Sequence, residues 1–115
     1  MRRTVVYLAC PMSIGSHTQN VINCIKVADE LIIKGYSPIV PVLTSMWDIV
    51  SPKTHEEWLQ YDFGLVGVSD CLLRIPGVSV GADMEMDYAV RNVIPVFTSR
   101  YDLYTDMPSA QEIPL

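Results

Sequence analysis

Short apolar runs alternate with longer segments of helical periodicity along most of this chain. Residues 4–9 form a run rich in β-branched side chains, a pattern typical of a strand buried on both faces of a parallel sheet. After a loop over residues 10–15, apolar positions recur at helical spacing as far as residues 34–35, where lysine and glycine form a typical helix end. These positions are Val21, Cys24, Ile25, Ala28, Leu31 and Ile32. The pattern predicts a strand, a loop and a helix in that order.

A second strand is predicted over residues 37–42, and two prolines interrupt it. Pro38 and Pro41 cannot donate hydrogen bonds to a neighbouring strand, so we expect this strand at an edge of the sheet. The pattern leaves open whether residues 44–50 form a short helical turn.

The second half of the chain repeats the alternation. Thr54 and Glu57 have the spacing of a capping box, which predicts the start of a helix. The remaining prediction is a helix over residues 54–68, a strand over 71–75, a helix over 81–92 and a strand over 93–97. Residues 98–115 form a weakly patterned tail.

Strands that alternate with helices predict an α/β fold with right-handed crossovers. We expect three layers with a parallel sheet of four to five strands in the order 2-1-3-4, which is a flavodoxin-like or Rossmann-like arrangement. Ligands bind such sheets beyond the carboxyl ends of the strands, where the strand order reverses. The predicted site therefore lies between the first and third strands, at the loops 10–15 and 76–80.

Composition narrows the function. Half of the 115 residues are apolar and only 18% are charged, which favours one globular domain over residues 1–115. The net charge is −5, and no basic cluster follows Arg2 and Arg3, so we expect no duplex nucleic acid partner. No apolar run reaches membrane-spanning length, so we expect no membrane partner.

The three cysteines and two histidines of the chain form a poor set of metal ligands. Cys10, Cys24 and Cys71 form no C-x-x-C pair, so we expect reduced thiols, a cytoplasmic location, and neither a metal nor a cofactor. His17 and His55 stand near predicted helix starts and are expected to be exposed structural residues.

The most informative candidate for chemistry is Glu85. It stands about one turn into the predicted helix 81–92, next to a loop with two glycines over residues 76–81. A nearby positive helix end would favour an ionised carboxylate, which a nucleophile requires. First-turn glutamates also serve simply as helix-dipole complements, and from the residues alone that second interpretation is favoured.

Three further charged residues stand in unusual places. Arg74 lies within an apolar strand, where a guanidinium needs a carboxylate or phosphate partner unless it reaches the rim of the sheet. Asp62 shares a helix face with Trp58, which is unusual because carboxylates rarely face a core without a partner. Asp70 precedes the third strand, and its simplest role is that of a turn residue. Asp83 and Asp87 are expected to be solvated.

Three stretches together resemble the nucleoside 2-deoxyribosyltransferase-like family. Residues 7–13, YLACPMS, are similar to its Y-[LI]-A-G-P-M-[ST] start. Residues 58–62 and 69–73 resemble its W-x-x-[YR]-D helix and the following strand. Residues 79–89, SVGADMEMDYA, match its S-x-G-[AT]-x-x-E-x-x-x-A signature in both residue type and spacing. The resemblance covers about residues 4–97, and Cys10 stands where the family has glycine.

The resemblance implies roles for individual residues. Glu85 would attack C1′ of the sugar to form a covalent ester, with Asp70 on the side of the leaving base and Tyr7 positioning the glutamate. The substrate-binding residues expected from these motifs are Ser79, Gly81, Ser13, Met12, Cys10, Asp62 and Trp58. Family sites often take residues from a neighbouring subunit, so a homo-oligomer is also implied.

Ser79 bears on the substrate. Family members that act on free nucleosides have an aspartate six residues before the glutamate, whereas nucleotide hydrolases have a serine. A hydroxyl can donate to a phosphate that an aspartate would repel. The resemblance therefore favours an N-glycosidase of (deoxy)nucleoside 5′-monophosphates. The alternatives are base exchange by a nucleoside 2-deoxyribosyltransferase and a nucleotide-binding module without turnover.

Overall fold

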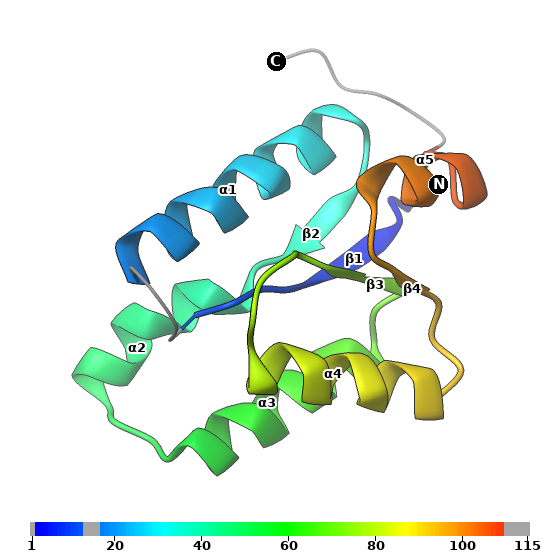
Figure 1. The fold of residues 1–115 in the computed structure, drawn as a ribbon. Helices are drawn as coiled ribbons and strands as arrows, with labels where there is room; N and C mark the ends of the chain where they lie inside the picture. The colour runs from blue at the N-terminus through cyan, green and yellow to red at the C-terminus, as the bar shows by residue number, and fades with distance from the viewer. Residues whose placement is uncertain (1, 13–16, 110–115) are drawn as a thin grey trace.

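The structure is a computed structural model that describes residues 2–12 and 17–109. Its described elements follow one another as strands and helices, as the sequence pattern predicts (Figure 1). In chain order they are β1 (Val5–Ala9), α1 (His17–Ile33), β2 (Ser37–Ile39), the 3₁₀ turn η1 (Pro41–Leu43), α2 (Thr44–Val50), α3 (His55–Gly67), β3 (Cys71–Arg74), α4 (Val80–Arg91), β4 (Val96–Phe97) and α5 (Arg100–Asp106).

The four strands form one parallel sheet in the order β2-β1-β3-β4, which confirms the predicted fold class and strand order. Within β1, side chains alternate between the two faces of the sheet. Val6 and Leu8 join the core on one face, whereas Tyr7 and Ala9 join the core on the other. The strand is buried on both sides because helices cover both faces.

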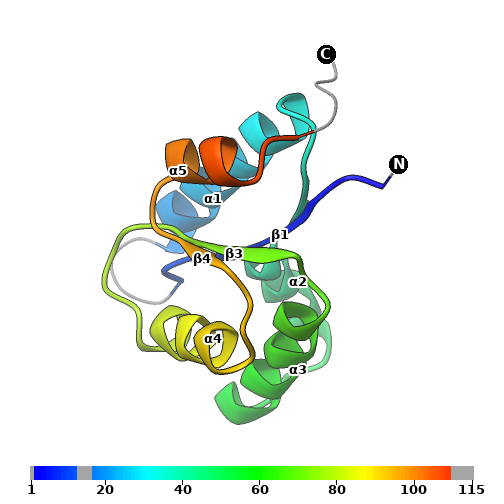
Figure 2. The ribbon, with the colours of Figure 1, turned by 90° about the vertical axis from the view of Figure 1, so that its right-hand side faces the viewer.

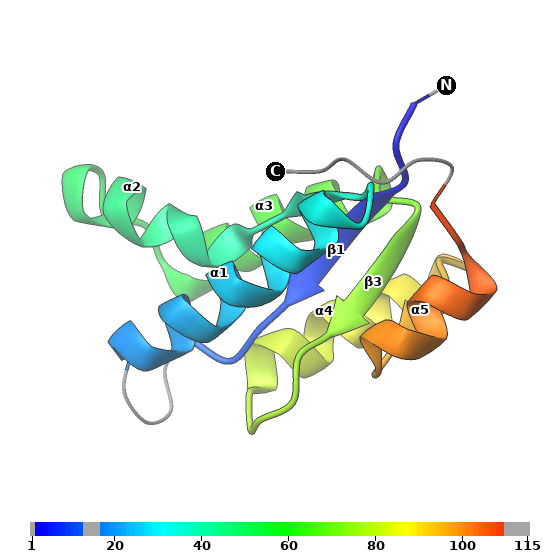
Figure 3. The ribbon, with the colours of Figure 1, turned by 90° about the horizontal axis from the view of Figure 1, so that it is seen from above.

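The helices form the outer two layers. Helices α1 and α5 cover one face of the sheet, and α3 and α4 cover the other (Figure 2). The view from above shows α1 beside β1, and α5 beside β3 (Figure 3). None of the helices within the described residues is both long and apolar enough to cross a membrane.

Strand β2 lies at the sheet edge, as its prolines predict, but it is shorter than expected. It ends at Ile39, because Pro41 begins the 3₁₀ turn that leads into α2. The chain therefore leaves the sheet early and places α2 beside the carboxyl ends of the strands.

Two other boundaries differ from the sequence pattern. Strand β4 begins at Val96 and not at residue 93, since Val93 has a φ of +58° and is 90% exposed in the turn after α4. Helix α5 occupies part of the tail that showed only weak patterning. The Ser99 hydroxyl caps it by accepting a hydrogen bond from the Tyr101 N–H, and Leu103 is fully buried.

The structure corrects the prediction that all three cysteines are reduced. The structure joins Cys10 and Cys24 in a disulfide between the end of β1 and α1, and only Cys71 is free among the described residues. We expected three reduced thiols because the sequence has no close cysteine pair. Helix α1 packs back over β1 and brings together two cysteines 14 residues apart.

Candidate functional site

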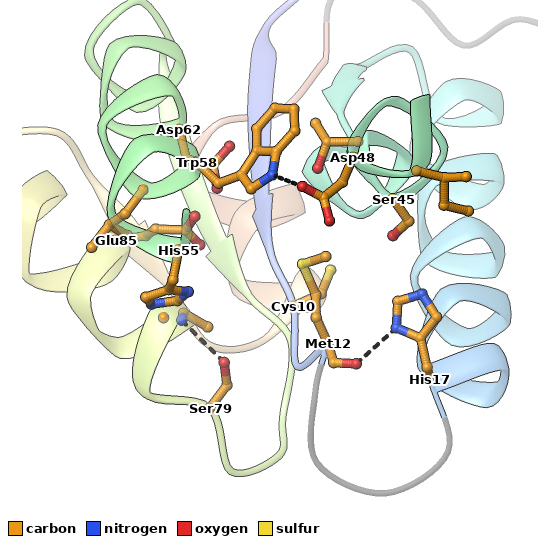
Figure 4. Close-up of a pocket in the computed structure, with 15 residues that line it drawn as sticks. Cys10, Met12, His17, Ser45, Asp48, His55, Trp58, Asp62, Ser79 and Glu85 are labelled. Carbon is orange, nitrogen blue, oxygen red and sulfur yellow. Dashed lines mark hydrogen bonds between the residues drawn. The ribbon is translucent and has the colours of Figure 1, made fainter. Parts of the chain in front are cut away.

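A cavity of about 460 Å³ opens at the carboxyl ends of β1 and β3 (Figure 4). Its position matches the site predicted where the strand order reverses, and its volume suits a small organic ligand. The walls come from the end of β1 and from the helices α1, α2, α3 and α4. The lining residues are Cys10, Met12, His17, Thr44, Ser45, Asp48, Ile49, His55, Trp58, Leu59, Asp62, Ser79, Gly81, Ala82 and Glu85.

Glu85 lines this cavity from the second turn of α4 and is only 6% exposed. Tyr7 lies beneath it on β1, on the face of the sheet that α4 covers. The Tyr7 hydroxyl donates a hydrogen bond of 2.6 Å to Oε2 of Glu85. This bond fixes the orientation of the carboxyl group.

The electrostatics of Glu85 differ from the expectation that the helix end keeps it ionised. Burial, and after it the neighbouring Asp62, raises the pKa of Glu85 to about 8. The hydrogen bond from Tyr7 and the more distant Arg74 act in the opposite direction but do not outweigh these effects. Glu85 is therefore protonated at neutral pH in the unliganded protein.

Asp62 reaches the same side of the cavity from α3. Burial raises its pKa, while the neighbouring Glu85 lowers it. Its Oδ1 atom is buried and has no hydrogen-bond partner among the described residues. Buried carboxylate oxygens are almost always satisfied, and a proton held between Asp62 and the neighbouring Glu85 would supply the missing partner. Glu85 and Asp62 form a pair of carboxyl groups that favours holding one proton between them.

Asp70 is not part of this pair. It lies at the amino end of β3, whereas the cavity lies at the carboxyl end. Its carboxylate binds the guanidinium of Arg2 at 2.5 and 2.7 Å and accepts a 2.8 Å hydrogen bond from the Val5 N–H. The Arg2 contact holds the pKa of Asp70 below its usual range. The expected catalytic role does not fit this position, since Asp70 pins the start of β1 to β3.

The loop between β3 and α4 is held by Arg74. Its guanidinium binds the Asp83 carboxylate at 3.0 Å and donates to the carbonyl oxygens of Ile75 and Gly77. Asp83 is thus the carboxylate partner that Arg74 required, and not simply a solvated residue. Gly77 has a φ of +131°, and a Cβ added there would lie 2.6 Å from Cγ of Pro11. The two loops that border the cavity therefore touch at a position that only glycine fits.

Ser79 and Gly81 line the cavity at the start of α4. The Ser79 hydroxyl oxygen accepts a hydrogen bond of 3.1 Å from the Ala82 N–H, so it caps the helix. Its own hydroxyl hydrogen remains available to a ligand. Gly81 lies within the first turn of the helix and does not have a positive φ.

The opposite wall was not predicted. Helix α2 contributes Asp48, whose Oδ1 accepts hydrogen bonds from Nε1 of Trp58 at 2.6 Å and from the Lys53 N–H at 2.9 Å. Figure 4 shows Asp48 on the far side of the cavity from Glu85, with Trp58 between them. Trp58 packs edge-on against Trp47 and Tyr61, which hold its ring in place.

Both histidines line the cavity, although each is exposed as expected. Nδ1 of His17 lies 3.0 Å from the carbonyl oxygen of Met12 and must donate, because a carbonyl only accepts. His55 begins α3, and its Cε1 lies 3.7 Å from where a Cβ on Gly81 would be. Their place at the cavity could have been suspected only from their positions at helix starts that face the same sheet edge.

The structure brings together most of the residues that the motifs singled out. Those that line the cavity are Cys10, Met12, Trp58, Asp62, Ser79, Gly81 and Glu85, with Tyr7 directly beneath. Asp70 lies elsewhere, and Ser13 falls outside the described residues. Within residues 2–12 and 17–109, no group of three His, Cys, Asp or Glu side chains could hold a metal ion.

Comparison with known proteins adds no assignment: no protein-family model matches the chain, and no curated protein matches it. The case for a function therefore rests on the residues of the cavity.

Proposed function

We propose that this protein is an N-glycosidase that cleaves the base–sugar bond of a deoxynucleoside 5′-monophosphate, with Glu85 as the nucleophile. The observation that carries the proposal is the pair of carboxyl groups, Glu85 and Asp62, on one side of a nucleoside-sized cavity. Glycosidic cleavage passes through a transition state with positive charge on the sugar, which a close carboxylate stabilises. Tyr7 acts as a positioning residue for Glu85.

The shared proton has a use in the first step. The leaving base is a poor leaving group unless its ring nitrogen is protonated as the bond breaks. Asp62, which lines the cavity, passes the proton of the pair to that nitrogen. The C1′–N bond breaks with its electrons moving to the base, and the Glu85 carboxylate forms a C1′–O bond.

The second step restores the pair. A water molecule attacks C1′ and gives one proton to the Asp62 carboxylate. The C1′–O bond to Glu85 breaks, and Glu85 leaves as a carboxylate. The products are the free base and the sugar phosphate, and the carboxyl pair again holds one proton. If a second base attacks C1′ in place of water, the same site exchanges bases.

Ser79 supports a phosphorylated substrate. A carboxylate at this position, close to Glu85 and Asp62, would add a second negative charge to the one that the pair carries. Ser79 is neutral there and keeps a hydroxyl hydrogen that can donate to a phosphate oxygen.

The proposal is tested by release of free base, followed by chromatography, from a panel of 2′-deoxynucleoside 5′-monophosphates and free deoxynucleosides. Wild type should release base, preferably from the monophosphates, whereas Glu85→Ala and the isosteric Glu85→Gln should not. A second set of reactions, with an added acceptor base, distinguishes transfer of the sugar to that base from hydrolysis. No release from any compound, with or without the acceptor, would contradict the proposal and favour a binding module.

A further inference from the structure

The wall of the cavity opposite Glu85 has a hydrogen-bonding character of its own. It consists of Asp48 with Thr44 and Ser45, all from α2. Figure 4 shows Asp48 and Ser45 on this wall, facing the side that carries Glu85 and Asp62. Glycosidic cleavage at Glu85 uses none of these three residues.

The two donors that hold Asp48 both bind the same oxygen. Nε1 of Trp58 and the N–H of Lys53 donate to Oδ1 at 2.6 and 2.9 Å. Oδ2 has no partner among the described residues and turns towards the cavity. These contacts hold the pKa of Asp48 below its usual range, chiefly through the Trp58 bond, so the group is an acceptor and not an acid.

The neighbouring hydroxyl groups add further acceptors. Thr44 donates its hydroxyl hydrogen to the carbonyl oxygen of Pro41, and Ser45 donates to that of Val42, both at 2.8 Å. Each hydroxyl has one hydrogen, so only oxygen lone pairs remain for a ligand. The α2 wall therefore presents acceptors alone.

We propose that Asp48 recognises the nucleobase and selects bases that carry an exocyclic amino group. This inference rests on the proposed function, because Glu85 fixes the sugar on one side and leaves the base to extend across the cavity. An amino group donates to Oδ2 of Asp48, whereas a carbonyl oxygen at the same ring position meets a carboxylate and two lone-pair-bearing hydroxyls. Trp58, held by both Asp48 and its aromatic neighbours, forms a rigid wall beside the base.

Asp48→Asn should invert this selection and keep the hydrogen bonds that Trp58 and Lys53 donate to residue 48. Trp58 and Lys53 both donate, so the amide must turn its oxygen towards them. Its NH₂ group then takes the place of Oδ2 in the cavity. The variant presents a donor where the wild type presents an acceptor, and it differs from the wild type by one group of equal size.

The test compares substrates that differ at one group: dCMP against dUMP, and dAMP against dIMP. We expect wild type to favour the amino member of each pair by roughly 10- to 100-fold in kcat/KM, the value of one hydrogen bond to a charged group. Asp48→Asn should remove or reverse the preference. Asp87→Asn, the same change on the exposed side of α4, should keep it. Dissociation constants for the four nucleotides are measured by calorimetry in the Glu85→Gln background, with and without Asp48→Asn.

The outcomes separate this inference from the proposed function. Base release without a preference, or with one that Asp48→Asn leaves unchanged, overturns the role of Asp48 while the glycosidase stands. An amino preference in binding that Asp48→Asn abolishes, with no base release by wild type, supports Asp48 and overturns the glycosidase. Neither binding nor release with any nucleotide overturns both.

Discussion

The hydroxyl of Tyr7 lies 2.6 Å from Oε2 of Glu85, although the two residues are 78 positions apart in the chain. Tyr7 is fully buried on β1, and Glu85 is almost fully buried on α4. A buried carboxyl group with one fixed donor can adopt few orientations, so this contact sets the direction from which Glu85 meets a ligand. The parallel sheet makes the contact possible, because alternation along β1 turns Tyr7 towards α4.

Removal of this hydroxyl should therefore affect chemistry more than folding. In Tyr7→Phe, we expect base release to fall about 10- to 100-fold, because the carboxyl group loses its orientation and a donor to its charged form. The Tyr7 bond lowers the pKa of Glu85, so its loss should move the alkaline limb of the pH–rate profile to higher pH. A rate loss without that displacement would show that the bond does not act on the ionisation of Glu85.

Asp62 and Asp70 should behave differently when each is changed to asparagine. Asp62→Asn removes the proton carrier of the pair, and we expect base release to fall at least about 100-fold. Asp70→Asn should leave kcat/KM within about twofold and lower the free energy of unfolding by about 1 kcal/mol, since it weakens the Arg2 and Val5 contacts. Both variants are compared by base release and by urea unfolding. The reverse ranking would return Asp70 to the catalytic role that the motifs implied.

The ionisation of Glu85 predicts a pH-dependent stability. Its pKa is raised in the folded protein to about 8 from an ordinary value of 4.5. The stabilisation from its protonated form is complete below the ordinary value and is lost as the pH rises through about 8. Between pH 5 and pH 8.5, wild type should lose stability relative to Glu85→Gln by on the order of a few kcal/mol. Urea unfolding at several pH values measures this, and parallel profiles for the two proteins would contradict a raised pKa.

Gly77 should tolerate no side chain. Its φ of +131° and the 2.6 Å approach to Pro11 predict that Gly77→Ala costs roughly 2–4 kcal/mol and disturbs both loops at the cavity. Gly64→Ala is the matched control, since no atom lies within 4 Å of its added Cβ inside α3. That control should stabilise the protein by up to about 1 kcal/mol. Thermal unfolding of both variants checks the contrast, and equal effects would contradict it.

The fold was largely predictable because its signals are local. Short apolar runs marked the strands, the prolines placed β2 at the edge, and Thr54 with Glu57 formed the predicted capping box. Helix α5 was missed because it is short and only Leu103 in it is fully buried, with Tyr104 partly buried against the same core, and two adjacent positions show no periodicity.

The site was only partly predictable. Glu85, Tyr7 and Ser79 stood in recognisable motifs next to strand ends, where parallel α/β folds bind ligands. Asp48 gave no such signal, because it reaches the cavity only after β2 ends early and α2 turns over the sheet edge. The choice of Asp62 over Asp70 likewise depends on the fold, because Asp62 reaches the cavity from α3, whereas Asp70 lies at the amino end of β3, away from the cavity.

The claim that Glu85 is a covalent nucleophile is tested most directly by trapping the ester. A 2′-fluorinated 2′-deoxynucleoside 5′-monophosphate slows both steps because fluorine disfavours positive charge on the sugar. Intact-mass and peptide mass spectrometry of wild type should show one added sugar phosphate, located on Glu85, and none in Glu85→Gln. Base release by wild type with no adduct, or with an adduct on another residue, would contradict the proposed mechanism.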